Sequence, residues 1–314
     1  MFSCSNYRTI PKIRPLLCRT STKAVMSTSI EVEEVRHSRG VLNRHSKPAV
    51  TMWHDEYYGV QLRYYLRGIK YRPSAPHSLT IRRDVLRWEM WNNAAGKIHR
   101  FKLPATTKYN SKGIVEKERW FIEGENVGFE NGPVSVEYYM TGEKYIESWL
   151  DIDAKNHQLD FNYQPSRILY HINGHKREER WCDGAGKQSK LIRYGEDGKH
   201  TYMAYFQRGV YGRMDGSEGP AVTRYHKNGR VSSEEWYCCG QHRRTDRPAS
   251  IKYDFKGNKI EERWCVTTGD QISRKDGPAI IKYRPNGQIL HEKFMTDGII
   301  DRIVRYDRFG AVLS

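Results

Sequence analysis

Glutamate is the residue of this 314-residue chain whose recurrence most resembles a catalytic pattern, because a carboxylate at a fixed spacing could act as a general acid or base. Catalysis, however, needs one carboxylate that differs from the others. Six glutamates occupy equivalent positions, two residues before an aromatic residue: Glu118, Glu147, Glu179, Glu234, Glu262 and Glu292. Six equivalent carboxylates favour a structural ladder, and we expect its donors to be the loop arginines Arg72, Arg100, Arg244 and Arg274.

Cysteine and histidine are the other side chains that could carry chemistry. Twelve histidines are scattered without an H-E-x-x-H spacing, and the cysteines form no C-x-x-C pair: Cys4, Cys18, Cys182, Cys238, Cys239 and Cys265. Phosphate-binding and nucleophile-elbow motifs are also missing from the sequence. The sequence therefore predicts no catalytic residue, no metal, no cofactor and no disulfide framework, and a reducing compartment is the simpler interpretation.

The glutamates belong to a unit of about 28 residues that recurs at least eight times. In its clearest copy, Pro220 is followed by a tyrosine five residues later, a glycine nine later, the glutamate fourteen later and a tryptophan sixteen later. The repeat tryptophans are Trp120, Trp149, Trp181, Trp236 and Trp264. Copies at Pro48 and Pro76 are degraded, and a truncated copy keeps Tyr306 and Gly310. Such self-similarity indicates a stacked array over residues 48–314.

Each unit reads as one β-hairpin. Asn-Gly or Asp-Gly, as at Asn228-Gly229, separates two short alternating runs and predicts a two-residue turn with positive φ. Counting outward pairs the residue three after the proline with the glutamate, and the small residue one after it with the tryptophan. The predicted fold is all-β, an extended twisted antiparallel sheet or solenoid of tandem hairpins.

Alternation places the glutamates, tyrosines and tryptophans on one packed face and basic residues on the other. We predict that this basic face is solvated and binds a partner. Its candidate residues are Lys108, Arg119, Arg180, Arg224, Lys252, Arg263, Lys282 and Lys293.

The composition favours a thin, surface-rich molecule with an acidic partner. Mean hydropathy is −0.81, net charge is +16 with a pI near 9.5, and no run is long and apolar enough for a transmembrane helix. A protein partner is the leading expectation. Nucleic acid is the alternative, because basic and aromatic residues alternate along the strands. The oligomeric state stays open.

Residues 1–47 are expected to form a basic, disordered arm. No acidic residue occurs between Met1 and Ile30, whereas arginines and lysines are spread among serines and threonines. Residues 1–25 could instead be a mitochondrial targeting segment, or Met26 could be a second start. A cytoplasmic or virion-associated location is the main expectation.

The unit resembles MORN-like hairpin repeats of bacterial antitoxin-like proteins and of proteins from large DNA viruses. The residues that carry the resemblance run from Arg274 to Tyr283 and from Tyr225 to Trp236. The resemblance implies a non-enzymatic scaffold for protein interaction or assembly, with a virion-associated structural role or an antitoxin-like neutralising role as specific forms. The unit is longer than a standard MORN repeat and poorer in glycine, so lipid binding does not carry over.

Overall fold

The fold is an open, all-β array, and the computed structural model describes residues 30–34, 48–54, 59–128, 132–149, 164–183, 186–213, 219–238, 240–244, 247–265, 272–274 and 276–313. No helix occurs in these ranges. The alternating runs of the repeat form strands of mostly four to eight residues. One long antiparallel sheet contains 22 of the described strands, and β17 and β18 form a separate pair.

The first twelve strands are β1 (Ile30–Glu34), β2 (Val50–His54), β3 (Gly59–Arg63), β4 (Ser78–Arg82), β5 (Val85–Met90), β6 (Thr106–Tyr109), β7 (Val115–Arg119), β8 (Ser135–Tyr138), β9 (Lys144–Ser148), β10 (Arg167–Tyr170), β11 (Lys176–Cys182) and β12 (Gln188–Tyr194). The others are β13 (His200–Gln207), β14 (Val210–Tyr211), β15 (Val222–Tyr225), β16 (Val231–Glu235), β17 (Tyr237–Cys238), β18 (Gln241–His242), β19 (Ser250–Tyr253), β20 (Lys259–Arg263), β21 (Ile280–Tyr283), β22 (Ile289–Thr296), β23 (Ile299–Tyr306) and β24 (Val312–Leu313).

Strand order in space follows strand order in sequence. Each strand of the main sheet pairs with the strands before and after it, and only the short strands β14, β17 and β18 stand outside this succession. The succession begins with β1 against β2, so it starts upstream of residue 48, the predicted beginning of the array. The remainder of the predicted arm, residues 1–29 and 35–47, and the targeting segment lie outside the described residues.

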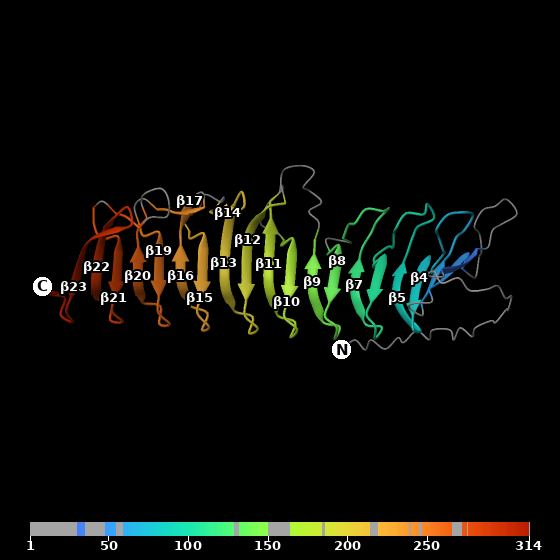
Figure 1. The fold of residues 1–314 in the computed structure, drawn as a ribbon, viewed down its shortest axis with the longest axis horizontal. Helices are drawn as coiled ribbons and strands as arrows, with labels where there is room; N and C mark the ends of the chain where they lie inside the picture. The colour runs from blue at the N-terminus through green and yellow to red at the C-terminus, as the bar shows by residue number, and fades with distance from the viewer. Residues whose placement is uncertain are drawn as a thin grey trace.

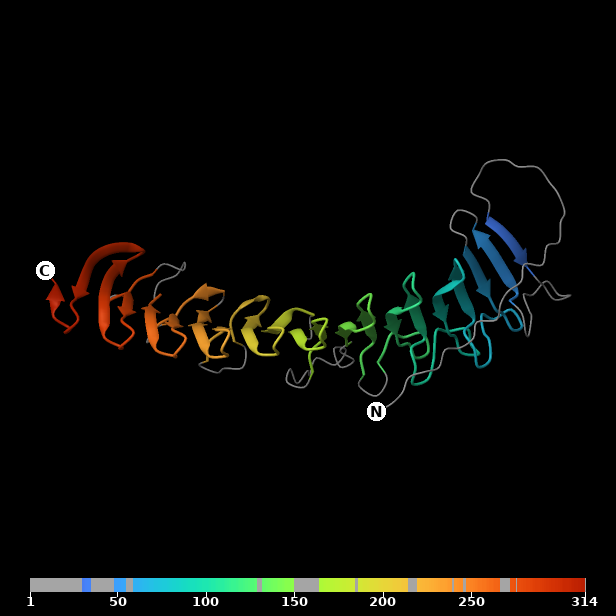
Figure 2. The ribbon, with the colours of Figure 1, turned by 90° about the horizontal axis from the view of Figure 1, so that it is seen from below.

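The molecule is long, narrow and twisted. Short turns join the strands along one long side of the sheet, and longer loops join them along the other side (Figure 1). Seen from below, the row of hairpins follows a shallow arc, and the strands are seen lengthwise near both ends but foreshortened in the middle (Figure 2). This change of direction is the accumulated twist expected of adjacent strands.

The predicted strand register is confirmed in all six well-formed units. Thr223 pairs with Glu234, Ile251 with Glu262 and Ile281 with Glu292. The three upstream pairs are Thr107 with Glu118, Val136 with Glu147 and Ile168 with Glu179. The spacing of the repeat therefore determined which residues lie opposite each other.

The predicted turn type, by contrast, was wrong for these hairpins. The His226 amide bonds to the Arg230 carbonyl and the Gly229 amide to the His226 carbonyl, so the turn has four residues and only Gly229 has positive φ (85°). The register then shifts opposite Arg224 and Tyr225, which pair with Ser233 and Val231, so the second strand has a bulge there. The bulge adds one residue to the second strand and so restores the register that a two-residue turn would give. Two-residue turns with two positive φ angles do occur, at Arg83-Asp84, Arg208-Gly209 and Asp297-Gly298.

The core is a thin central band, because a single sheet has no second layer to cover it. The residue after the repeat proline is fully buried in several units, as at Ala105, Ala249 and Ala279. Its amide bonds within its own hairpin, while its carbonyl accepts from the preceding unit's tryptophan amide; Ala249, for example, accepts from Trp236 at 2.8 Å. This residue therefore joins two successive units through its backbone, which explains why it is small.

Candidate interaction surface

A continuous row of paired residues, here called the glutamate row, runs through the centre of the face that carries the repeat tyrosines. Each glutamate of the row lies between two shorter side chains of the neighbouring strands. Glu262, for example, pairs with Ile251 on one side and Ile281 on the other. Glu147, Glu179 and Glu262 are 6–7% exposed. Such carboxylates need strong hydrogen-bond partners, because burial of an unpaired charge is costly.

The partner that every repeat glutamate shares is the tyrosine of the next unit. Tyr138 donates to Glu118 at 2.6 Å, Tyr253 to Glu234 at 2.8 Å, Tyr283 to Glu262 at 2.8 Å and Tyr306 to Glu292 at 2.7 Å. Tyr170 and Tyr194 donate in the same way to Glu147 and Glu179. We call each such pair a rung. The tyrosine lies diagonally across from the glutamate on the adjacent strand, within reach of a long side chain.

A lysine completes three of these rungs. Lys144, Lys176 and Lys259 each contact the glutamate three residues later, at 2.6, 2.6 and 2.8 Å. Residues three apart on a regular strand point to opposite faces, but the bulge after each turn adds a residue and brings the lysine to the glutamate's face. Burial, and then the hydrogen bond to the carboxylate, raise the pKa of the tyrosines above its ordinary value, as at Tyr283. The row is thus a ladder that links successive units.

The loop arginines were expected to serve these glutamates, and this expectation was wrong for most of them. The guanidinium carbon of Arg274 lies 3.7 Å from the centre of the Trp264 ring, and Arg244 lies 4.5 Å from Trp236. Arg72 lies 4.0 Å from Tyr64 and Arg100 3.8 Å from Trp91, although Arg100 is also 3.9 Å from Glu89. The arginines therefore cover the aromatic rings by cation–π contact, and the tyrosines supply the donors.

The opposite face carries the predicted basic residues in a second continuous row, here called the cation row. Register pairs join Arg193, Tyr202, Arg224, Ser233, Lys252, Glu261 and Lys282 across successive strands. Lys108 belongs to the same row upstream, where it pairs with Lys117. Arg119, Arg180, Arg263 and Lys293 lie two residues further along their strands on the same face. The structure therefore places all eight candidates on one face.

This face also carries acidic residues, which the prediction of a basic, solvated face did not include. Glu178 lies 2.5 Å from Arg180 and 2.9 Å from Arg193, and Arg224 is paired with Glu235. Burial opposes the ionisation of Glu178, but the two arginines outweigh it and hold its pKa below its usual value. The face was predicted to be basic and solvated. It instead carries many ion pairs with an excess of cations, and only part of it is exposed to solvent.

Another group of ion pairs surrounds Glu261. Its carboxylate lies 2.6 Å from Arg263, 3.2 Å from Lys252 and 3.7 Å from Lys282. Further upstream, Lys108 is paired with Glu116 at 2.6 Å and Lys117 with Glu137 at 2.5 Å. The buried carboxylates of Glu178 and Glu261 restrict the motion of the cations around them, whereas the exposed Lys108–Glu116 pair is held less firmly.

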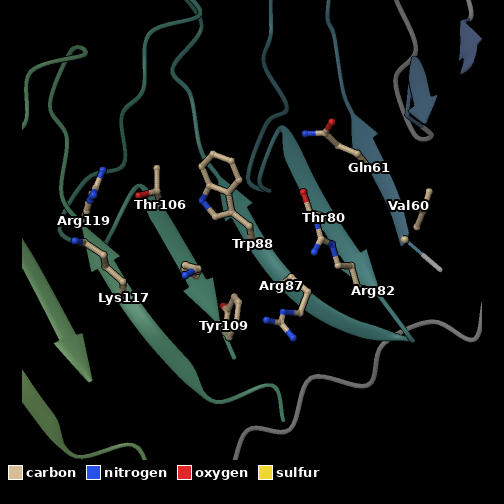
Figure 3. A pocket seen from close by; sticks show the side chains of 12 residues that line it. Val60, Gln61, Thr80, Arg82, Arg87, Trp88, Thr106, Tyr109, Lys117 and Arg119 are labelled. Carbon is tan, nitrogen blue, oxygen red and sulfur yellow. The ribbon is translucent and has the colours of Figure 1, made fainter. Parts of the chain in front are cut away.

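A cleft of about 550 Å³ opens on this face over β3 to β7. Figure 3 shows Trp88 on β5, with Gln61 and Thr80 on one side and Thr106, Lys117 and Arg119 on the other. Arg82, Arg87 and Lys108 also line the cleft. Trp88 is 38% exposed, so its indole can be reached from outside.

Sequence reasoning missed two features of this region. Glu89 pairs with Leu79, three residues after Pro76, so the unit at Pro76 keeps its glutamate and its tryptophan, Trp91. Its turn is shorter by one residue, and a search that allowed one deletion would have found the unit. Trp88 does not belong to the repeated residues. Its place beside cations becomes visible only when the neighbouring strands are paired, because Lys108 lies next to it on the adjacent strand.

No group of three or more histidine, cysteine, aspartate or glutamate side chains is arranged to hold a metal within the described part of the chain. Over the same ranges, no helix has the length and hydropathy needed to cross a bilayer.

Comparisons with known proteins return little. No family model matches the chain, and no curated protein does. Solved structures that match weakly are crystal structures of TcdB2-TccC3-TEV, TcdB2-TccC3 and TcdB2-TccC3 without its hypervariable C-terminal region. Their sequence identities are 12, 11 and 12%, with TM-scores of 0.13, 0.13 and 0.14. The matches cover 90, 84 and 88% of this chain but 19% of each of those chains, and similarity this low carries no argument about fold or function.

Proposed function

We propose that this protein is a non-enzymatic, MORN-like hairpin-repeat scaffold that binds an acidic protein partner along its cation row. The observation that carries the proposal is the continuity of that row, whose register pairs pass from strand to strand without a break from β12 to β21. The cations of the row, Arg193, Arg224, Lys252 and Lys282, stand on every second strand, so a partner with spaced carboxylates would meet them at intervals of about 10 Å.

The arrangement of charges supports binding as well as folding. Around Glu261, the three cations Lys252, Arg263 and Lys282 face one carboxylate, which leaves an excess of positive charge. The carboxylate also restricts the motion of these long side chains before a partner arrives. Binding to side chains that are already ordered loses less conformational entropy, so the ion pairs favour association.

The glutamate row supports a role as a rigid display surface. Tyrosine–glutamate rungs couple each unit to the next, so the cations on the other face keep a constant spacing along the molecule. Equivalent units with equivalent contacts suit the display of a surface better than a reaction at one place. Assembly in a virion and neutralisation of one partner would both use such a surface. The stoichiometry of the native complex distinguishes them, because the first gives a large assembly and the second a single tight complex.

Charge reversal on the cation row tests the proposal. The variant changes Arg224, Lys252, Arg263 and Lys282 to glutamate, and a matched control changes four exposed cations of the loops and turns, Lys97, Lys112, Lys227 and Lys256. Both lose the same net charge. Partners that co-purify with the native protein are identified by mass spectrometry, and circular dichroism verifies the fold of each variant.

We expect the cation-row variant to lose its partners and the control to keep them. Binding should also weaken as the salt concentration rises, because the contacts are electrostatic. Retention of every partner by a folded cation-row variant would contradict the proposal, as would equal losses in both variants.

A further inference from the structure

The cleft over β3 to β7 combines an exposed aromatic ring with a concentration of positive charge. Its lining includes Trp88 and Tyr109 together with the cations Arg82, Arg87, Lys108, Lys117 and Arg119. No carboxylate lines it within the described ranges. The cleft therefore attracts anions and presents a flat apolar ring beside them.

The sheet register fixes the order of these groups. Thr80 pairs with Trp88, Trp88 with Lys108, and Lys108 with Lys117. Neighbouring strands lie about 4.8 Å apart, so the indole and the first ammonium group project from positions one strand apart. The small hydroxyl side chains of Thr80 and Thr106 leave space around the ring (Figure 3).

Two of the cations in this cleft already have acidic partners; the Lys108–Glu116 contact is exposed and the Lys117–Glu137 contact is half-buried. Lys108 and Glu116 are 57% and 41% exposed, and Lys117 and Glu137 are 28% and 36% exposed. An exposed ion pair contributes little to stability, so an anionic ligand can compete with Glu116 for Lys108. Arg119 is exposed at the edge of the same cleft.

No other unit holds an indole at the position of Trp88, although the unit that carries Met203 in place of the glutamate holds Tyr202 there, between Arg193 and Arg224. The position before the row glutamate holds Trp88 in the unit at Pro76, but it holds Lys117, Ile146, Glu178, Ser233, Glu261 and His291 in the well-formed units. The repeat thus does not require an aromatic residue at this position. Trp88 is a departure from the pattern that lies among cations.

We propose that this cleft binds single-stranded nucleic acid, with a base stacked on Trp88 and backbone phosphates bound by Lys108, Arg119 and Arg87. Cations along a groove together with an aromatic platform are the combination that recognises single strands without sequence preference. Every nucleotide carries both a phosphate and a flat base, whereas a run of acidic side chains would use the cations and leave the indole without a stacking partner. The site goes beyond the proposed scaffold function and uses a different part of the sheet.

The test measures the fluorescence anisotropy of labelled fifteen-nucleotide oligothymidine and oligouridine on titration with the full chain. The first variants are Trp88→Ala and Trp88→Phe, with Phe101→Ala as the matched control because Phe101 is 67% exposed on a loop outside the cleft. The second pair is Arg119→Glu and Lys293→Glu. Arg119 and Lys293 occupy the same position in their units, on the same face.

Trp88→Ala should weaken binding about 5- to 150-fold, the effect of removing the stacking of one base, whereas Trp88→Phe keeps an aromatic ring and should weaken it less. Arg119→Glu should weaken binding and reduce its dependence on salt by about one contact, whereas Phe101→Ala and Lys293→Glu should have little effect. A label-free poly-glutamate peptide should compete poorly.

The proposal fails if neither oligonucleotide binds. It also fails if Lys293→Glu weakens binding as much as Arg119→Glu, which would indicate diffuse attraction to the whole face. Effective competition by poly-glutamate would assign the cleft to an acidic protein segment instead. None of these results would decide the scaffold proposal. That proposal is tested with a different variant, whose four changes lie between residues 224 and 282.

Discussion

Removal of the Tyr283 hydroxyl group tests whether the rungs hold the array together. Tyr283 donates to Glu262 Oε2 at 2.8 Å, and Lys259 occupies the other carboxylate oxygen at 2.8 Å. Glu262 is 7% exposed, so water has little access to replace a lost donor. Tyr283→Phe keeps the ring and removes only the donor, which leaves Oε2 of a buried carboxylate without its partner.

The expected loss of stability follows from the nature of this bond. Hydrogen bonds to charged groups contribute about 1.5–3 kcal/mol, more than bonds between neutral groups. The lysine keeps its contact with the carboxylate in the variant. We therefore expect Tyr283→Phe to lower the free energy of unfolding by about 2 kcal/mol.

The chain contains a matched control at Tyr225. This tyrosine holds the same position in its unit, but the preceding unit has Met203 where the others have glutamate, paired with Thr223 and Ile192. Tyr225→Phe therefore removes a hydroxyl group that has no carboxylate at the rung position. Its cost should be below about 0.5 kcal/mol, the usual range for surface changes.

Urea denaturation followed by circular dichroism measures the global effect, and hydrogen exchange by mass spectrometry locates it. Exchange should accelerate in β20 and β21 for Tyr283→Phe, because local opening is controlled by the contacts of each unit. A double-mutant cycle of Tyr283→Phe with Glu262→Gln should give a coupling energy of about 1–2 kcal/mol. Equal costs for the two tyrosine variants, or a coupling energy near zero, would refute the reasoning.

Three further predictions concern the same sheet. The rung tyrosines have a raised pKa in the folded state, so their contribution to stability is complete below pH 10 and is lost as pH rises above it. Alkaline unfolding, followed by tyrosine absorbance, should therefore begin near pH 10. The unfolding curve should shift when rungs are removed by Tyr→Phe changes. His77 is 3% exposed, and burial, followed by the charges of Lys70 and Arg63, lowers its pKa from 6.5 to about 4. The protein should therefore lose about 2 kcal/mol of stability between pH 6.5 and pH 4, after allowance for solvent screening, and His77→Phe should flatten that part of the pH profile in urea denaturation. Gly287 has a φ of 85°, and an added Cβ would meet no atom within 4 Å. Gly287→Ala should therefore lower the free energy of unfolding by about 1–2 kcal/mol through backbone strain alone, and Gly287→Asn should lower it less, as measured by thermal denaturation. Equal losses of stability in the two variants would argue against strain.

Much of the fold could be predicted from spacing. The distance from proline to glutamate and tryptophan fixed the pairing of Thr223 with Glu234, because a period of two leaves only one register that keeps the repeated residues on one face. The same alternation placed Lys252 and Lys282 together on the opposite face. Local turn geometry was less predictable. Asn228-Gly229 is compatible with two turn types, and the bulge makes both give the same register.

The partners of the glutamates could not be predicted from charge alone. Arginine in the preceding loop was the obvious donor, but the Arg274 amide bonds to the carbonyl of Met295 in the next unit, and this bond holds the loop where the guanidinium stacks on Trp264. The tyrosine is nearer because it stands on the adjacent strand, two residues beyond the glutamate's partner. Diagonal neighbours across strands appear only when strands of successive units are placed side by side.

The sequence by itself determined the strand register, the two faces and the equivalence of the units, since these depend on spacing along the chain and on alternation within each strand. The tertiary structure alone decided which groups meet between units: tyrosine with glutamate, arginine with tryptophan, and Trp88 with the cations of the strands beside it. Such contacts depend on lateral distances of a few ångströms between residues that are about 10 to 20 positions apart in the chain. Residue spacing in a sequence does not encode those distances, whereas the sheet fixes them.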